Sequence, residues 1–216
     1  MMLPLDAAVL GAALDALPVF PLPGVVLFPR AILPLHIFEP RYRQLLADVM
    51  AGHRCMAMAY TLGGGESPRI APVAGAGIVV RYEPMSDGRS NILLHGRARV
   101  LLEELPFEPP YRRARARILN DKPGSVAEVQ RAALLSAAAA FVTEARKHAV
   151  TVEFELPDGA DASATADLCA HHLLLDAPAR QRVLEELDVG ARVLLVTGEL
   201  AAQTARLARE RGTEAN

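Results

Sequence analysis

The spacing of apolar positions changes once along the chain, close to residue 120. From 17 to 119, apolar and polar residues alternate over short runs that prolines and glycines interrupt, a pattern typical of β-strands. Beyond 120–124, apolar residues recur about every 3.6 positions, as on one face of a helix. The pattern predicts an α+β protein, with a mainly antiparallel β lobe over 1–120 followed by a small α-helical bundle over 121–216.

The β lobe is predicted to contain one clear helix among several strands. Prolines before residue 38 favour short extended segments, whereas 39–50 is expected to form a helix that begins near Pro40 and stops at Gly52. Strands are predicted over 55–62, 77–82, 91–102 and 111–119. The dipeptide Asp87-Gly88 supplies the turn that joins the second and third of these strands into a hairpin.

The second lobe is predicted to be helical. Helices are expected over 126–149, 180–187 and 191–211, and a further short one is expected over 3–16 at the amino terminus. The last helix has an apolar face from Val193 to Leu207. This face is either covered within the monomer or available for a dimer, so the oligomeric state stays open.

Composition favours a folded protein without an export signal. The chain of 216 residues is 51% apolar and has a formal net charge of −2, which excludes a disordered chain and a global polycation. Its two cysteines, Cys55 and Cys169, are too few for a disulfide framework or a paired-cysteine zinc site. No basic segment precedes Arg30, and prolines interrupt the longest uncharged apolar run, 16–29. We expect a cytoplasmic protein that does not contact the membrane.

Motifs for catalysis are weak. The glycines at 63–65 are followed by Glu66, where a phosphate-binding loop needs a lysine. The only lysines, Lys122 and Lys147, lie in a turn and near a helix end, and neither place suits a desolvated nucleophile. No set of nucleophile, base and oxyanion donors can be assembled. We therefore expect neither an enzyme nor a bound cofactor.

Cys169, His171 and His172 raise the question of a metal site. Cys169 and His172 would share one helix face, but two ligands do not make a site. A buried thiol beside surface histidines explains the same pattern, so no metal is expected.

Two pairs of neighbouring side chains could be suggested as an acid and a base. They are His36 with Glu39 and Asp48 with His53. Their spacing is not diagnostic, and a histidine within an apolar strand more often has a structural role.

Arginines alternate with small or apolar residues on two predicted strands. The candidate residues for binding an anion or an RNA backbone are Arg97, Arg99, Arg113, Arg115 and Arg117. The competing interpretation is a solvated sheet face whose charge Glu103, Glu104 and Glu108 balance. Because the net charge is negative and no aromatic stacking pair is evident, the second interpretation is preferred and nucleic acid is not expected as a partner. RNA binding through these arginines remains the alternative function.

Several ordered motifs resemble the amino-terminal, substrate-binding domain of the ATP-dependent protease Lon. The most specific are the proline-rich stretch Leu17–Pro29 and the segment Leu33–Arg43. The likeness continues through Gly75–Gly77, Asp87–Arg89, Leu94–Val100, Tyr111–Arg115 and Leu184–Val189. These motifs cover about 17–200, and their order makes coincidence improbable.

The resemblance implies a PUA-like pseudo-β-barrel packed on a helical bundle, and a role in holding polypeptide rather than cutting it. The motifs carry no catalytic residues. ATPase and protease modules are not expected in this sequence, so we expect an adaptor or polypeptide-binding protein whose partner is an unfolded or extended segment or one specific protein. Candidate anchors for such a segment are Phe28, Phe38, Tyr42 and Tyr82, although aromatic residues in such strands and first helical turns more often pack into the core.

Overall fold

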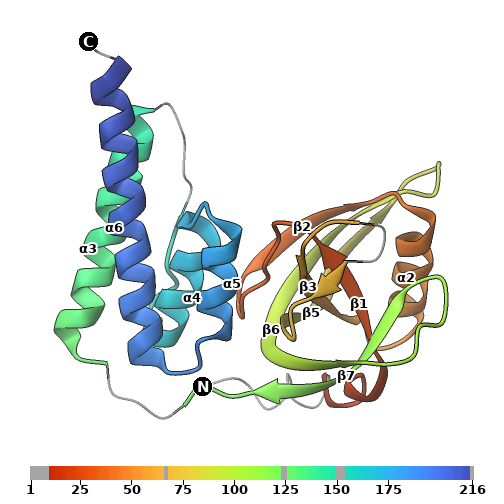
Figure 1. Cartoon of the computed structure of the whole chain (residues 1–216). Coiled ribbons are helices and arrows are strands. Elements are labelled where there is room, and N and C mark those ends of the chain that lie inside the picture. The colour runs from red at the N-terminus through yellow and green to blue at the C-terminus, as the bar shows by residue number, and fades with distance from the viewer. Residues whose placement is uncertain (1–9, 66–67, 123–125, 149–153, 215–216) are drawn as a thin grey trace. The chain divides into compact units, whose positions relative to one another are not determined.

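The computed structural model describes residues 10–65, 68–122, 126–148 and 154–214, with side chains through residue 210. The chain divides into two compact units, residues 1–119 and 120–216. The division lies one residue before the boundary expected from the change in apolar spacing. Each unit is described below by itself, and Figure 1 labels most of their elements.

The first unit is a closed barrel built from five strands. Its elements are a short 3-10 helix η1 (Leu14–Ala16), strands β1 (Leu17–Leu22), β2 (Ile32–Ile37), β3 (Cys55–Leu62), β4 (Arg69–Ile70), β5 (Val73–Pro84), β6 (Ser90–Glu104) and β7 (Arg112–Leu119), and helix α2 (Pro40–Ala51). Neighbouring strands follow the order β1-β7-β6-β5-β3, and a pairing of β1 with β3 closes the ring. That closing pair is parallel, whereas the other strand pairs of the described residues are antiparallel. The expected β lobe is therefore confirmed, as a mixed barrel.

Local sequence signals explain the helix and the hairpin of this unit. Helix α2 has Pro40 in its first turn and ends at Gly52, and its buried face consists of Tyr42, Leu45, Leu46 and Val49. These side chains fill one half of the barrel core. Strands β5 and β6 form the predicted hairpin, in which Gly88 takes the positive φ of +81° that the turn requires.

The loop between β1 and β2 crosses the sheet where β5 and β6 carry glycines. Leu27 and Phe28 in this loop are fully buried. A β-carbon at Gly75 would lie 1.9 Å from the Leu27 carbonyl oxygen, and one at Gly96 would lie 2.0 Å from the Phe28 carbonyl oxygen. Only glycine lets the loop backbone approach the strands this closely.

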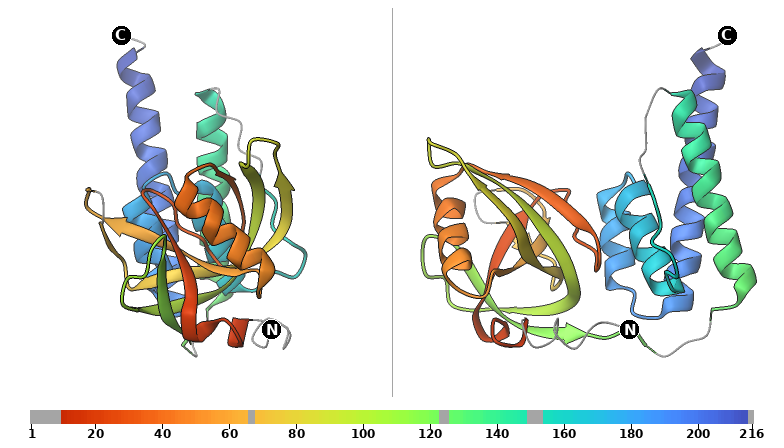
Figure 2. Two further views of the ribbon diagram at one scale, coloured as in Figure 1. Left: turned by 90° about the vertical axis from the view of Figure 1, so that its right-hand side faces the viewer. Right: turned by 180° about the vertical axis from the view of Figure 1, so that it is seen from behind.

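The second unit is a helical bundle, as predicted. It contains α3 (Glu128–Lys147), α4 (Ala162–Leu173), α5 (Ala177–Glu185) and α6 (Val189–Glu214), and α6 packs against each of the other three. Helices α3 and α6 lie side by side along most of the length of α3 (Figure 2). Asp161, Asp176 and Asp188 each accept a hydrogen bond from a backbone N–H in the first turn of the helix that follows.

The apolar face of α6 is largely covered. Val193, Val196 and Leu200 are fully buried, whereas Leu194 is exposed on another side of the helix. These buried residues belong to the core and do not offer a surface for a second copy of the chain.

A buried arginine joins the start of α6 to α4 and to the first residues of this unit. The Arg192 side chain has no exposed area and forms ion pairs with Asp121 and, at 3.2 Å, with Asp167. Its Nη1 also donates to Ser163 Oγ at 3.0 Å, and its Nε donates to the Glu186 carbonyl oxygen at 2.9 Å. The positive charge of Arg192 is thus compensated, and its N–H groups donate hydrogen bonds inside the protein, as a buried guanidinium requires.

Candidate functional site

The structure does not bring the four candidate anchors together. Phe28 is fully buried, so its expected role as a surface anchor is wrong for this conformation. Tyr42 is only 6% exposed and packs on Phe20, with ring centroids 4.2 Å apart. Phe38 and Tyr82 are exposed by 58% and 42%, but Phe38 stacks beside His36 while Tyr82 lines a separate pocket at the start of α2. Binding through Phe38, Tyr42 or Tyr82 stays a prediction.

The candidate arginines follow β6 and β7, but they do not form one free basic surface. Arg99 is buried, and Arg97 is partly buried. Arg113 lies 3.9 Å from Glu108, and Arg115 lies 3.8 Å from Glu103. Arg117 is exposed. Carboxylates therefore accompany the exposed part of this strip, as the solvated-face interpretation requires.

The side chains considered as acid–base pairs contact other residues. His36 Nδ1 lies 2.7 Å from Asn91 Oδ1, and Glu39 forms an ion pair with Arg41 at 2.9 Å. Asp48 accepts a hydrogen bond of 2.6 Å from the hydroxyl of Tyr111. Neither suggested pair is found as a hydrogen-bonded acid and base.

The cysteine and histidines of α4 do not gather further ligands. Cys169 is fully buried, and the rings of His171 and His172 meet edge to face at 4.9 Å. Burial lowers the pKa of His172. Within the described ranges, no group of three metal-binding side chains is found.

Both thiols are expected to be unreactive in the folded protein. Burial raises the pKa of Cys55 to about 11 and that of Cys169 to about 12, so the thiolate fraction at neutral pH falls by roughly a hundredfold or more. A disulfide reagent that releases a coloured thiolate should label neither cysteine in buffer and both in denaturant. Rapid labelling of one thiol in buffer would contradict this burial.

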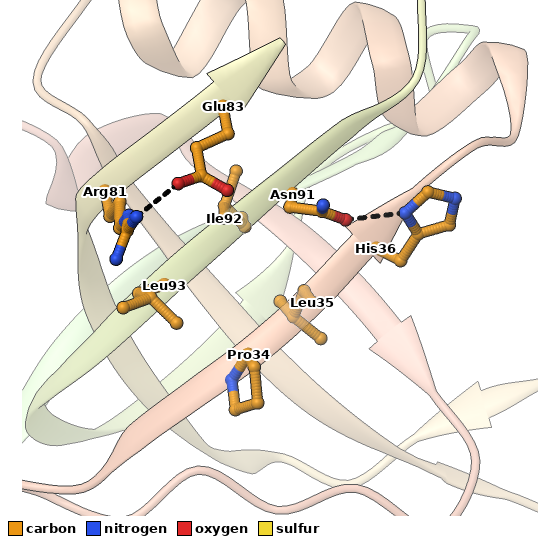
Figure 3. A pocket seen from close by; sticks show the side chains of 8 residues that line it. All are labelled: Pro34, Leu35, His36, Arg81, Glu83, Asn91, Ile92 and Leu93. Atoms are coloured by element: carbon orange, nitrogen blue, oxygen red, sulfur yellow. Dashed lines mark hydrogen bonds and ion pairs between the residues drawn. The ribbon is translucent and has the colours of Figure 1, made fainter. Parts of the chain in front are cut away.

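One pocket lies on the outer surface of the sheet formed by β2, β6 and β5. It has a volume of about 410 Å³, and Pro34, Leu35 and Leu93 contribute its apolar surface. Figure 3 shows these side chains beside two polar pairs, the Arg81–Glu83 ion pair at 2.5 Å and the hydrogen bond between His36 and Asn91. The charges at this pocket are balanced within it.

A longer depression lies where the ends of β1, β3, β4, β6 and β7 meet α2. It consists of two pockets of about 450 and 320 Å³ that share Pro68, Phe107 and Arg112. We call it the proline–aromatic groove. Its other apolar residues are Pro21, Pro23, Tyr42, Leu105, Pro110 and Tyr111. These residues come from β1, α2, the region of β4 and the connection from β6 to β7, all within the first unit.

The floor of the groove is buried and its rim is exposed. Tyr42 and Tyr111 are buried, and the Tyr111 hydroxyl is held by Asp48 in α2. Burial is the main cause that raises the pKa of both phenols, so they remain protonated at neutral pH. Phe107 stands at the junction of the two pockets and is 63% exposed. A large exposed aromatic ring beside concave apolar surface is typical of a docking site.

Tyr42, which the sequence analysis named as a candidate anchor, lines this groove, whereas Phe107 and Arg69 were not among the candidates. The run 105–110 lies between two predicted strands, and three of its six residues are proline. An aromatic residue inside such a connection was the available signal, since loops carry binding residues more often than strands do.

Among the residues that the structure describes, none of the helices combines the length and the apolar character that crossing a membrane requires.

The chain is similar to known proteins over most of its length. Residues 16–202 match the family described as the ATP-dependent protease La (LON) substrate-binding domain. A Lon protease of Roseiflexus castenholzii is 30% identical over 186 residues, covering 83% of this chain and 23% of that protease. A Lon protease of Desulfosudis oleivorans is 25% identical over 203 residues, covering 88% of this chain and 24% of that protease. The chain thus spans about a quarter of the length of these relatives.

Two solved structures share the fold. A Lon N-terminal domain protein from Xanthomonas campestris superposes with a TM-score of 0.64 at 19% identity, covering 85% of this chain and 97% of that chain. The N-terminal domain of the Mycobacterium avium complex Lon protease gives a TM-score of 0.61 at 13% identity, covering 86% of this chain and 98% of that chain. The resemblance drawn from the sequence motifs is confirmed, and the chain belongs to the family of LON substrate-binding domains.

Proposed function

We propose that this chain is a non-catalytic module that binds extended or unfolded segments of polypeptide in the proline–aromatic groove. The observation that carries the proposal is Phe107, a 63% exposed aromatic side chain at the junction of two pockets. The matched family is described as substrate-binding, and its full-length relatives are proteases, whose substrates are polypeptides.

The shape and chemistry of the groove suit an extended chain better than a folded surface. Two connected pockets that share Phe107 can accept neighbouring side chains of one extended segment. Proline rings and aromatic faces offer apolar surface that requires no particular hydrogen-bonding group of a ligand, so the apolar part of the groove can accept segments of many sequences. A floor held by the Tyr111–Asp48 hydrogen bond limits the entropy lost on binding.

The sequence first indicated an adaptor role and a cytoplasmic location, and both are part of this proposal. The choice between a general unfolded substrate and one specific protein partner also belongs to it. RNA binding has no comparable support, because Arg99 is buried and carboxylates accompany Arg113 and Arg115.

Replacing Phe107 by serine is expected to weaken binding of an unfolded polypeptide by roughly tenfold, because a central aromatic contact is lost. The measurement is fluorescence anisotropy with a labelled, unstructured peptide that contains phenylalanine and no charged residue. Phe107 is exposed, so the variant should keep the stability of the wild type.

The matched control is Phe38→Ser, which removes an equally large exposed ring outside the groove. It should bind like the wild type. Loss of binding in Phe38→Ser but not in Phe107→Ser would move the site to the sheet surface of Figure 3 and contradict the groove. Absence of saturable binding by the wild type would reject polypeptide binding itself.

A further inference from the structure

We propose that the proline–aromatic groove selects polypeptide segments in which carboxylate side chains lie next to an aromatic or large apolar residue. This inference rests on the proposed function and names the class of segment that the same site prefers.

Among the described residues that line the groove, arginines outnumber carboxylates. These residues include three arginines, Arg41, Arg69 and Arg112, and one carboxylate, Glu104. The sheet pocket of Figure 3 differs, because its described lining residues include one arginine and one glutamate, which form an ion pair. An anionic ligand is therefore favoured at the groove in particular.

Each of the two pockets has arginine at its edge. Arg41 and Arg112 line the larger pocket, and Arg69 and Arg112 line the smaller one. The Arg41 guanidinium also lies over the ring of Tyr42, 4.5 Å from its centroid, which places positive charge directly at the aromatic floor. A carboxylate one or two residues from a side chain in either pocket would reach a guanidinium, because successive residues of an extended chain are about 3.3 Å apart.

The three arginines differ in whether a carboxylate of the protein already pairs with them. Arg112 is 3.3 Å from Glu104, and Arg41 is 2.9 Å from Glu39. Arg69 is exposed, and no described carboxylate lies within ion-pair distance of it. Arg69 is thus the residue whose replacement should alter the charge preference with the least effect on the fold.

The overall charge of the protein cannot produce this preference. At a net charge of −2, the chain as a whole weakly repels an acidic ligand. A preference for acidic segments must therefore arise locally, and it must depend on the arginines of the groove rather than on arginines elsewhere.

The test uses three labelled peptides that share the same phenylalanines and differ only in flanking residues, which are glutamate, glutamine or lysine. At low salt the glutamate peptide should bind roughly tenfold more tightly than the lysine peptide, with the glutamine peptide between them. The difference should shrink at high salt because the arginines are partly exposed, whereas binding of the glutamine peptide should change little.

Arg69→Glu should remove or reverse the preference for the glutamate peptide over the lysine peptide. The matched control is Arg115→Glu, which makes the same change of net charge at an exposed position on β7, outside the groove. Far-ultraviolet circular dichroism and urea unfolding of both variants check independently that each is folded.

The outcomes separate the two proposals. If none of the peptides binds, the proposed function fails. If all three bind equally well, polypeptide binding stands and the preference for acidic segments is overturned. Equal effects of Arg69→Glu and Arg115→Glu would assign the preference to overall charge and also overturn it. The preference is likewise overturned if single-stranded RNA binds to the wild type and loses affinity in Arg69→Glu, because the groove would then accept polyanions in general.

Discussion

An Arg192→Met variant is expected to lose about 3–5 kcal/mol of the free energy of unfolding of the helical unit. Methionine is apolar and of similar length, but it leaves the buried carboxylate of Asp167 without this cation and removes the ion pair to Asp121. The Ser163 hydroxyl and the Glu186 carbonyl oxygen also lose a donor. The measurement is urea unfolding followed by the far-ultraviolet circular dichroism of the helices.

The control is Arg182→Met, which breaks a 2.7 Å ion pair with Glu199 that is more than half exposed on the arginine side. Arg182→Met should lower the free energy of unfolding by less than about 1 kcal/mol, since exposed ion pairs contribute little to stability. All four tyrosines, at 42, 60, 82 and 111, lie in the β unit, so their fluorescence follows that unit separately. If Arg192→Met costs no more than Arg182→Met, the buried network does not stabilise the bundle.

Gly75→Ala is expected to destabilise the barrel by about 3 kcal/mol or more, because the new methyl group would lie 1.9 Å from the carbonyl oxygen of Leu27. The clash would lie between the backbone of the loop and the new methyl group on the backbone of β5, so one of these two segments must move to relieve it. That movement opens the packing around Leu27, which is fully buried. Urea unfolding followed by tyrosine fluorescence measures the loss.

Gly64→Ala provides the matched control in the same unit. A β-carbon there meets no atom within 4 Å, and the residue is exposed. The free energy of unfolding should therefore change by no more than about 0.5 kcal/mol. A tolerated Gly75→Ala would mean that the loop does not need its close approach to β5.

Elements with local signals could be predicted from the sequence. Strand β3 occupies 55–62 as predicted, α2 ends at the expected Gly52, and Asp87-Gly88 forms the turn of the hairpin. Pairings between distant segments could not be predicted in the same way. The parallel pairing of β1 with β3 has no signature in either strand, because alternation of apolar residues does not specify a neighbour.

The candidate site was harder to predict than the fold. Alternation along a strand cannot show whether an aromatic residue in a neighbouring loop points inward, and Phe28 does so because its loop crosses over Gly96. The groove around Phe107 is assembled from segments between residues 21 and 112, so its residues have no common spacing in the sequence. Family likeness identified the type of protein, whereas the location of the groove required coordinates.

The position of β1 has a consequence for folding during synthesis. β1 pairs with β3 on one side and with β7 on the other, and β7 begins only at Arg112. A nascent chain can therefore form the β5–β6 hairpin early, but the backbone groups of β1 that face β7 have no strand to pair with until the last strand has left the ribosome. Translation that pauses before this point would expose an open strand edge, and the growing chain would be most prone to aggregate in that interval.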